Sequence, residues 1–97
     1  MTRRVVITGL GAVSPLGNDV PTMWSAALAG RSSAGPITQF DTTGYKTRFA
    51  CEVKDFDVTP LVGKKEARRM DRFTQFAVSA AKQALDQASY KFSVVVG

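Results

Sequence analysis

Five cationic side chains fall within nine residues and form the most prominent candidate for a binding site. They are Lys64, Lys65, Arg68, Arg69 and Arg72. Against Glu66 and Asp71 they give residues 64–72 a net charge of +3, out of +5 for the whole chain. Clustered cations attract carboxylates or phosphates and accelerate the encounter with an anionic partner. A run of charges is as often a solvated helix face, so the charge pattern alone leaves both interpretations open.

These cations begin the longest helix that the sequence predicts, residues 64–88. The segment has no internal glycine or proline and is rich in Ala, Gln, Lys and Arg, which favour helix. With Lys64 placed at 0° and about 100° per residue, the five cations fall between 0° and about 140° around the helix axis. Phe76, at about 120°, lies on the same side. The opposite face is apolar and comprises Met70, Phe73, Ala77, Ala81, Ala84, Leu85 and Ala88. We expect a buried face and a positive face, with the cations at the helix N-terminus, where the helix dipole disfavours them.

Residue counts exclude several kinds of catalytic site from these 97 residues. The sequence contains no histidine and a single cysteine, Cys51. A Ser-His-Asp triad, a Cys-His pair and an imidazole acid or base are therefore impossible within this chain alone. One cysteine builds neither a cysteine-rich zinc site nor an intramolecular disulfide. We interpret Cys51 as a small strand residue, because a reactive thiolate needs a base or a dipole beside it.

The composition also bears on the compartment. A chain without a disulfide framework is typical of a reducing cytoplasm. The longest uncharged apolar run is far too short to cross a bilayer. We therefore expect a cytoplasmic protein.

A glycine-rich segment, residues 9–18, raises a second candidate, a phosphate-binding loop. The dinucleotide fingerprint requires a glycine at its sixth position, and counting from Gly9 that position holds Ser14. The Thr-Gly-x-x-x-Gly variant fails at Val13, and no P-loop lysine follows. We therefore interpret the segment as a tight exit from a strand, where glycine allows the backbone to pack closely.

Two short segments, residues 5–8 and 92–96, have the pattern of buried strands. Neither alternates polar and apolar residues, which favours strands covered on both faces of a sheet, with an edge strand as the alternative for the first. A covered strand needs neighbours on both sides, yet the second run ends one residue before Gly97. We therefore expect residues 1–97 to be a truncated part of a larger α/β domain.

Residues 21–29 predict a helix and residues 47–53 predict a half-exposed strand. Asp19 suits the helix cap, Pro21 its first turn and Gly30 its end. The strand pattern is one of alternation. We expect a loop over 31–36 and a turn over 55–60. The helix face expected to be buried consists of Trp24, Ala27 and Leu28. The strand face expected to be buried consists of Phe49, Cys51 and Val53.

Three ordered stretches resemble the β-ketoacyl-acyl-carrier-protein synthases, specifically the N-terminal region of the elongating type II enzyme of bacterial fatty-acid synthesis. The first is RRVVITGLGAVSPLGN, residues 3–18. The second runs from FDT, which begins at residue 40, to VKDF, which ends at residue 56, and the third is KEARRMDRFTQF, residues 65–76. Three motifs in order and at similar spacing are far more specific than a lone Gly-x-Gly.

The resemblance implies a thiolase-like α/β fold, a mixed sheet flanked by helices, of which residues 1–97 would be the N-terminal portion. It implies an acyltransferase that loads an acyl chain from a carrier protein onto a cysteine and condenses it with decarboxylated malonyl-carrier protein. Histidines stabilise the developing charge, and no metal or organic redox cofactor takes part in the condensation. The family is cytoplasmic and homodimeric, with no membrane or nucleic-acid partner. Its catalytic cysteine and histidines lie in later motifs, so no catalytic residue is assigned here.

The same resemblance favours a docking role for the cations. Lys65, Arg68 and Arg69 match basic residues that contact the acidic, phosphopantetheine-bearing acyl carrier protein, and Lys64 and Arg72 extend the set. One alternative is a non-catalytic fragment that binds an acidic carrier protein. Another is a basic helix that binds nucleic acid, which requires aromatic or amide groups among the cations. The first aromatic residue after them, Phe73, is expected to face inward.

Overall fold

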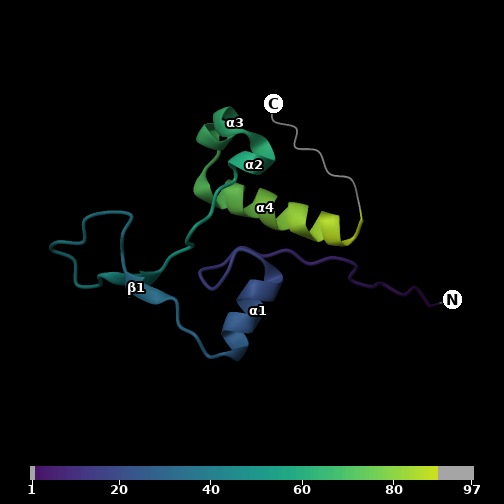
Figure 1. The fold of residues 1–97 in the computed structure, drawn as a ribbon, viewed down its shortest axis with the longest axis horizontal. Helices are drawn as coiled ribbons and strands as arrows, with labels where there is room; N and C mark the ends of the chain where they lie inside the picture. The colour runs from purple at the N-terminus through teal and green to yellow at the C-terminus, as the bar shows by residue number, and fades with distance from the viewer. Residues whose placement is uncertain (1, 90–97) are drawn as a thin grey trace.

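The computed structural model describes residues 2–89, which form the long helix α4, three shorter helices and one two-stranded sheet (Figure 1). The elements are α1 (Val20–Leu28), β1 (Ala34–Pro36), β2 (Phe49–Cys51), α2 (Thr59–Val62), α3 (Lys64–Arg69) and α4 (Arg72–Gln87). Helices α2 and α3 lie on one side of α4, and α1 with the N-terminal segment lies on the other. The strand predicted over residues 92–96 falls outside the described residues.

Helix α1 confirms the predicted start signal. Asp19 is extended, and its Oδ1 accepts a hydrogen bond from the Thr22 amide at 2.8 Å, as an N-cap residue does. The predicted apolar face is wrong, because Trp24 is 60% exposed and Leu28 is 69% exposed. Ala26 is the buried residue of this helix, and within residues 2–89 no element covers the tryptophan.

The stability that the Asp19 cap gives to α1 depends on pH. Hydrogen bonds from the Thr22 amide and then the Thr22 hydroxyl hold the pKa of Asp19 below its ordinary value of 3.8. The stability it contributes is therefore present above the unfolded pKa and lost as the pH falls through the folded pKa. We expect the Thr22 amide NMR shift to change below about pH 4. Asp19→Asn keeps a capping oxygen without the charge, and the same titration in this variant would contradict the assignment.

The expectation of a covered strand over residues 5–8 is wrong. No strand forms there, and Val5 and Ile7 are 93% and 81% exposed. A β-branched run becomes a strand only when a neighbouring backbone accepts and donates its hydrogen bonds. Within the part of the chain that the structure describes, no strand lies beside this run.

The glycine loop that follows packs directly on α4, which confirms close backbone packing as its role. A Cβ atom on Gly9 would lie 2.0 Å from the carbonyl oxygen of Ala84, and one on Gly11 would lie 1.8 Å from that of Ala80. Both distances are far inside van der Waals contact, so only glycine fits at these two positions without displacement.

Two glutamines one helical turn apart on α4 bind the same loop. The Leu10 amide donates to Gln87 Oε1 at 2.6 Å, and the Ala12 amide donates to Gln83 Oε1 at 3.1 Å. Gln83 Nε2 also donates to the Asn18 carbonyl at 2.7 Å. These side chains pair with loop backbone groups that have no strand partner within residues 2–89.

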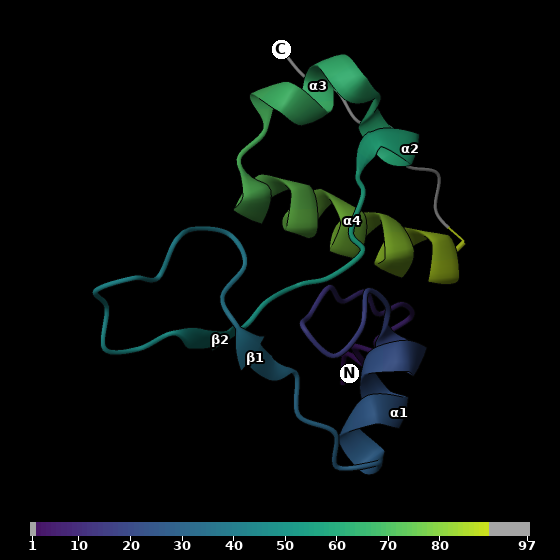
Figure 2. The same cartoon turned by 60° about the vertical axis from the view of Figure 1, so that its left-hand side comes forward.

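Strands β1 and β2 pair antiparallel, with Gly35 opposite Ala50 (Figure 2). Strand β2 is shorter than the predicted 47–53, and β1 lies inside the expected loop over 31–36. The predicted inner face is wrong as well, since Phe49 is 66% exposed and Cys51 is exposed. In a two-stranded sheet no second layer decides which face is buried.

The predicted helix over residues 64–88 is divided into α3 and α4, and α2 begins at Thr59, within the last two residues of the turn expected over 55–60. Met70 and Asp71 have extended backbones, with ψ of 135° and 157°. Gln75 Nε2 then donates to the Ala67 carbonyl at 3.0 Å, so a side chain of α4 satisfies a carbonyl at the end of α3. The same carbonyl also accepts from the Met70 amide at 3.3 Å, so it stays paired although α3 ends here.

The described residues bury little apolar surface. The buried hydrophobic residues in this part of the chain are Ala26, Val58 and Ala67. The radius of gyration is 16.7 Å, against about 13 Å for a compact chain of this size. Contacts of α4 with the segments on either side of it, rather than a large core, set the arrangement. Among residues 2–89, no helix is both long and apolar enough to cross a membrane.

Candidate functional site

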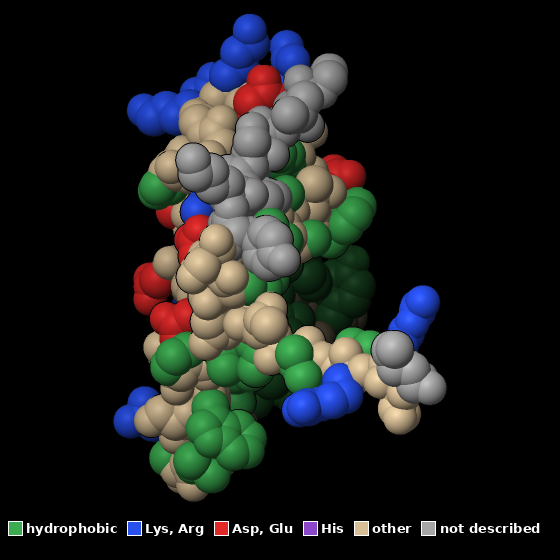
Figure 3. All heavy atoms as spheres, turned by 90° about the vertical axis from the view of Figure 1, so that its right-hand side faces the viewer, with side chains coloured by type: hydrophobic (Ala, Val, Ile, Leu, Met, Phe, Trp, Pro, Cys, Tyr) green, Lys and Arg blue, Asp and Glu red, His purple; other side chains and the backbone are tan. Residues whose placement is uncertain are grey.

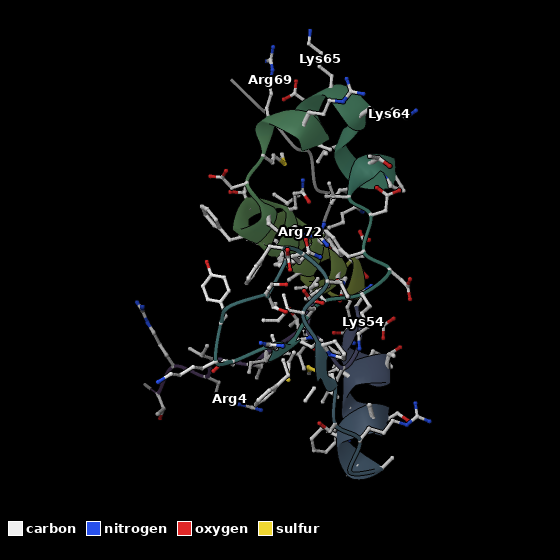
Figure 4. The ribbon with its side chains drawn as sticks, turned by 90° about the vertical axis from the view of Figure 1, so that its left-hand side faces the viewer. Arg4, Lys54, Lys64, Lys65, Arg69 and Arg72 are labelled. Atoms are coloured by element: carbon white, nitrogen blue, oxygen red, sulfur yellow. The ribbon has the colours of Figure 1, made fainter. Side chains whose placement is uncertain are left out.

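The cationic cluster is carried by two helices, which corrects the expectation of one continuous positive face. Lys64, Lys65, Arg68 and Arg69 belong to α3, whereas Arg72 is the first residue of α4. All five side chains are exposed. In Figure 4, Lys65 and Arg69 point outward from α3, away from the body of the molecule, while Arg72 lies near α4.

For two of the five cations, the break also reverses the expected effect of the helix dipole. Arg68 and Arg69 occupy the last turn of α3, and Glu66 lies in its first turn. Cations near a helix C-terminus and carboxylates near an N-terminus are stabilising arrangements. Arg68 and Arg69 are therefore favourably placed, whereas Lys64 and Lys65 remain at the N-terminus of α3 and Arg72 at that of α4, where the dipole disfavours them.

Within residues 2–89, no carboxylate lies within ion-pair distance of these cations. The ion pair found in this part of the chain joins Lys82 and Asp86 on α4, away from the cluster. Glu66 has one buried oxygen, Oε2, without a hydrogen-bond partner in the described structure. The space-filling view accordingly shows Lys and Arg side chains gathered at the α3 end of the molecule (Figure 3). This surface is positive and accessible.

The five cations form two groups with different surroundings. Lys65 and Arg69, here called the outer pair, project from α3 into solvent. The other three, here called the groove cations, line a groove of about 380 Å³ that also includes Phe56, Asp57 and Gln75. The groove cations are Lys64, Arg68 and Arg72. The structure thus places all five predicted residues at one end of the molecule but divides them between a convex surface and a concave one.

Arg72 is held by aromatic rings from two segments. Its guanidinium carbon lies 5.2 Å from the ring centroid of Phe56 and 5.0 Å from that of Phe76. The two rings meet edge to face, with centroids 5.0 Å apart. A cation over aromatic faces is stabilised by the ring quadrupole. The position of Phe76 on the predicted cationic face is the sequence signal for this contact, whereas nothing in the sequence pattern indicates Phe56.

Asp57 is the carboxylate of the groove, and its hydrogen bonds are already made. Its Oδ1 accepts from the Thr59 amide at 2.9 Å and from the Thr59 hydroxyl at 2.8 Å. The backbone hydrogen bond first, then the hydroxyl, and to a lesser degree the charge of Lys64 hold the pKa of Asp57 below its ordinary value. Asp57 is therefore ionised at neutral pH, and it offsets one of the three positive charges in the groove.

Two other sequence expectations have different outcomes. Phe73 is 72% exposed, so the expectation that it faces inward is wrong. Ala77 and Ala81, one and two turns along the same face of α4 and likewise expected to be buried, are exposed, because no element within residues 2–89 covers this part of the helix. Cys51 lies exposed on β2, outside the cationic groove.

The chain matches a known family along nearly its whole length. The model of the β-ketoacyl synthase N-terminal domain matches residues 2–95. The chain is 51% identical over 86 residues to 3-oxoacyl-[acyl-carrier-protein] synthase 2 of Synechocystis sp. and 52% identical over 86 residues to that of Staphylococcus aureus. It is 50% identical over 91 residues to that of Coxiella burnetii. These alignments cover 89%, 89% and 94% of this chain but only 21%, 21% and 22% of the relatives.

The fold agrees with the sequence match. The solved structure of the ishigamide ketosynthase/chain length factor superposes with a TM-score of 0.82 and 43% sequence identity, covering 92% of this chain and 22% of that one. This likeness confirms the α/β, thiolase-like fold class. The chain spans about one fifth of the length of the curated relatives that it matches. With its residues 2–95 matching the family's N-terminal domain, the chain belongs to the β-ketoacyl synthase family.

Proposed function

We propose that this protein is a 3-oxoacyl-[acyl-carrier-protein] synthase in which residues 1–97 form the N-terminal portion of the condensing-enzyme domain. Its reaction is a decarboxylative condensation between an acyl-enzyme and malonyl-carrier protein, and this segment supplies scaffold and a docking surface for the acidic carrier. The observation that carries the proposal is the set of five exposed cations of α3 and α4, which have no carboxylate partners among residues 2–89.

The chemical step requires side chains that residues 1–97 do not supply. The chain has no histidine to stabilise an oxyanion or enolate, and Cys51 is an exposed strand residue. The acyl-accepting thiolate and the charge-stabilising groups would therefore come from other parts of the same enzyme. The proposal includes a cytoplasmic location and a homodimer for the full-length protein.

The cationic surface suits an acidic protein for electrostatic reasons. Exposed charges act mainly on the rate of encounter and on orientation, and their effect falls with ionic strength. Because the cations lie on a helix pair and not on a flexible tail, they approach a partner with their relative positions already set. This arrangement would orient the carrier so that its phosphopantetheine arm is directed toward the active site.

Reversing the outer pair tests the proposal. In the full-length chain we expect Lys65→Glu with Arg69→Glu to weaken carrier binding by about tenfold or more and to flatten its salt dependence. Titration at several salt concentrations, by calorimetry or fluorescence anisotropy, measures both quantities. The matched control is Arg31→Glu with Lys46→Glu, which changes the net charge equally at two exposed cations outside the cluster. Unchanged affinity and an unchanged salt slope in the outer-pair variant would refute the docking role.

The same material separates the alternatives. Binding of the acidic carrier without binding of duplex DNA at moderate salt excludes a nucleic-acid binder. The DNA measurement is needed because Phe73 is exposed next to the cations, as an aromatic residue that contacts bases would be. Formation of a lengthened acyl product by the full-length protein separates an enzyme from a non-catalytic carrier-binding protein.

A further inference from the structure

We infer that the groove lined by Lys64, Arg68 and Arg72 is a preformed subsite for one carboxylate side chain of the acidic carrier protein, with Arg72 as its specificity-determining residue. This inference rests on the proposed function, because it takes the partner to be an acidic protein. It goes further by separating one concave subsite from the convex outer pair, Lys65 and Arg69.

The charge balance of the groove favours an anion. Three cations line it against one carboxylate, Asp57, and both hydrogen bonds to Asp57 Oδ1 come from Thr59. In the described part of the chain, no oxygen of Asp57 lies within ion-pair distance of the groove cations. The groove therefore keeps an excess of positive charge and N–H donors that an incoming carboxylate can use.

Arg72 is prepared for this contact by its aromatic neighbours. Phe56 and Phe76 restrict the guanidinium through cation–π contacts at 5.2 and 5.0 Å, and its one side-chain hydrogen bond in the described structure is a long one, 3.4 Å from Nη1 to Gln75 Oε1. Most of its donors therefore remain available. A planar fork that is already oriented loses less conformational entropy on binding than a free side chain does.

The neighbouring surface indicates why the occupant is a protein carboxylate. The outer pair lies on the same short helix as Lys64 and Arg68, so an anion in the groove is flanked at once by more cations on the outer side of α3. An acidic surface with several carboxylates can engage both groups together. A single phosphate group would use the groove alone and leave the outer pair without a partner.

The test compares Arg72→Lys and Arg72→Gln in the full-length chain. If the planar fork matters, we expect Arg72→Gln to weaken carrier binding about tenfold or more, and Arg72→Lys to recover only part of that loss although it keeps the charge. Phe56→Leu, which removes one ring while retaining the arginine, should give a smaller loss. Each variant is measured with the carrier both with and without its phosphopantetheine arm. Unchanged unfolding midpoints exclude a general loss of fold.

The possible outcomes are distinct. Equal losses with both carrier forms support a protein carboxylate, whereas a loss confined to the arm-bearing form assigns the groove to the prosthetic phosphate and overturns the inference. Wild-type affinity in Arg72→Lys overturns the role of the fork. If the outer-pair variant loses affinity and both Arg72 variants do not, the subsite is refuted and the proposed docking surface stands. If neither set of variants loses affinity, both are refuted.

Discussion

Gly11→Ala is expected to destabilise the fold by about 3 kcal/mol or more, near the upper end for overpacking. The added Cβ would lie 1.8 Å from the carbonyl oxygen of Ala80 and 2.7 Å from its carbonyl carbon. These are backbone atoms in the middle of α4, so no rotamer change relieves the clash, and the loop must move away from the helix. The backbone angles of Gly11 lie outside the left-handed region, so the cost comes from packing.

Gly35→Ala is the matched control for this prediction. No atom lies within 4 Å of a Cβ built on Gly35, so this substitution should change stability by about 0.5 kcal/mol or less. Gly9→Ala, with its Cβ 2.0 Å from the Ala84 carbonyl oxygen, should resemble Gly11→Ala. Chemical denaturation of the full-length protein measures all three. Equal stability of the Gly11 and Gly35 variants would show that the loop does not pack on α4 as described.

Gln83→Leu is expected to cost about 2–4 kcal/mol, because two backbone groups lose their partner at once. The Ala12 amide and the Asn18 carbonyl both bind this side chain, at 3.1 and 2.7 Å, in a partly buried setting. Leucine fills a similar volume but offers no polar atom. Unsatisfied groups that are partly screened from water carry most of the penalty.

Gln87→Leu is the comparison one turn along the same helix. It removes one hydrogen bond to the exposed Leu10 amide, for which about 1 kcal/mol or less is expected. Gln83→Glu retains an acceptor for Ala12 and loses the donor to Asn18, so an intermediate loss is expected. Hydrogen exchange at the Ala12 amide should accelerate in the leucine variant and much less in the glutamate variant. Equal unfolding free energies for the leucine substitutions at 83 and 87 would rule out the double role of Gln83.

The Gln83 hydrogen bonds also connect the N-terminal loop with the candidate groove. Asn18, whose carbonyl binds Gln83, donates from Nδ2 to the Lys54 carbonyl at 2.9 Å. Two residues further on, Phe56 packs against Arg72. A variant that frees the loop from α4 should therefore loosen the aromatic support of Arg72 as well as lower stability.

Local interactions account for the features that the residue pattern predicted correctly. The cap and proline signals predict α1 to within one residue of its start at Val20, because Asp19 and Thr22 are three residues apart. The absence of a third fingerprint glycine predicts that residues 9–18 pack closely instead of binding phosphate, and the loop does pack on α4. The motifs also predict the β-ketoacyl synthase family. The exposure of the cations is predictable because burying several unpaired charges would carry a large desolvation cost.

Contacts between distant segments, by contrast, set which faces are covered and how the cations are divided. The helical pattern of the sequence continues through Met70, but the helix ends there. The Gln75 side chain donates to the Ala67 carbonyl, which a continuous helix would have paired within its own backbone. The guanidinium of Arg72 packs on the ring of Phe56, sixteen positions earlier in the sequence. The glycine loop is bound through the Ala12 amide to Gln83, 71 positions later. Burial of a face and pairing of a strand depend on such distant partners. A pattern of neighbouring residues carries no information about where those partners will lie.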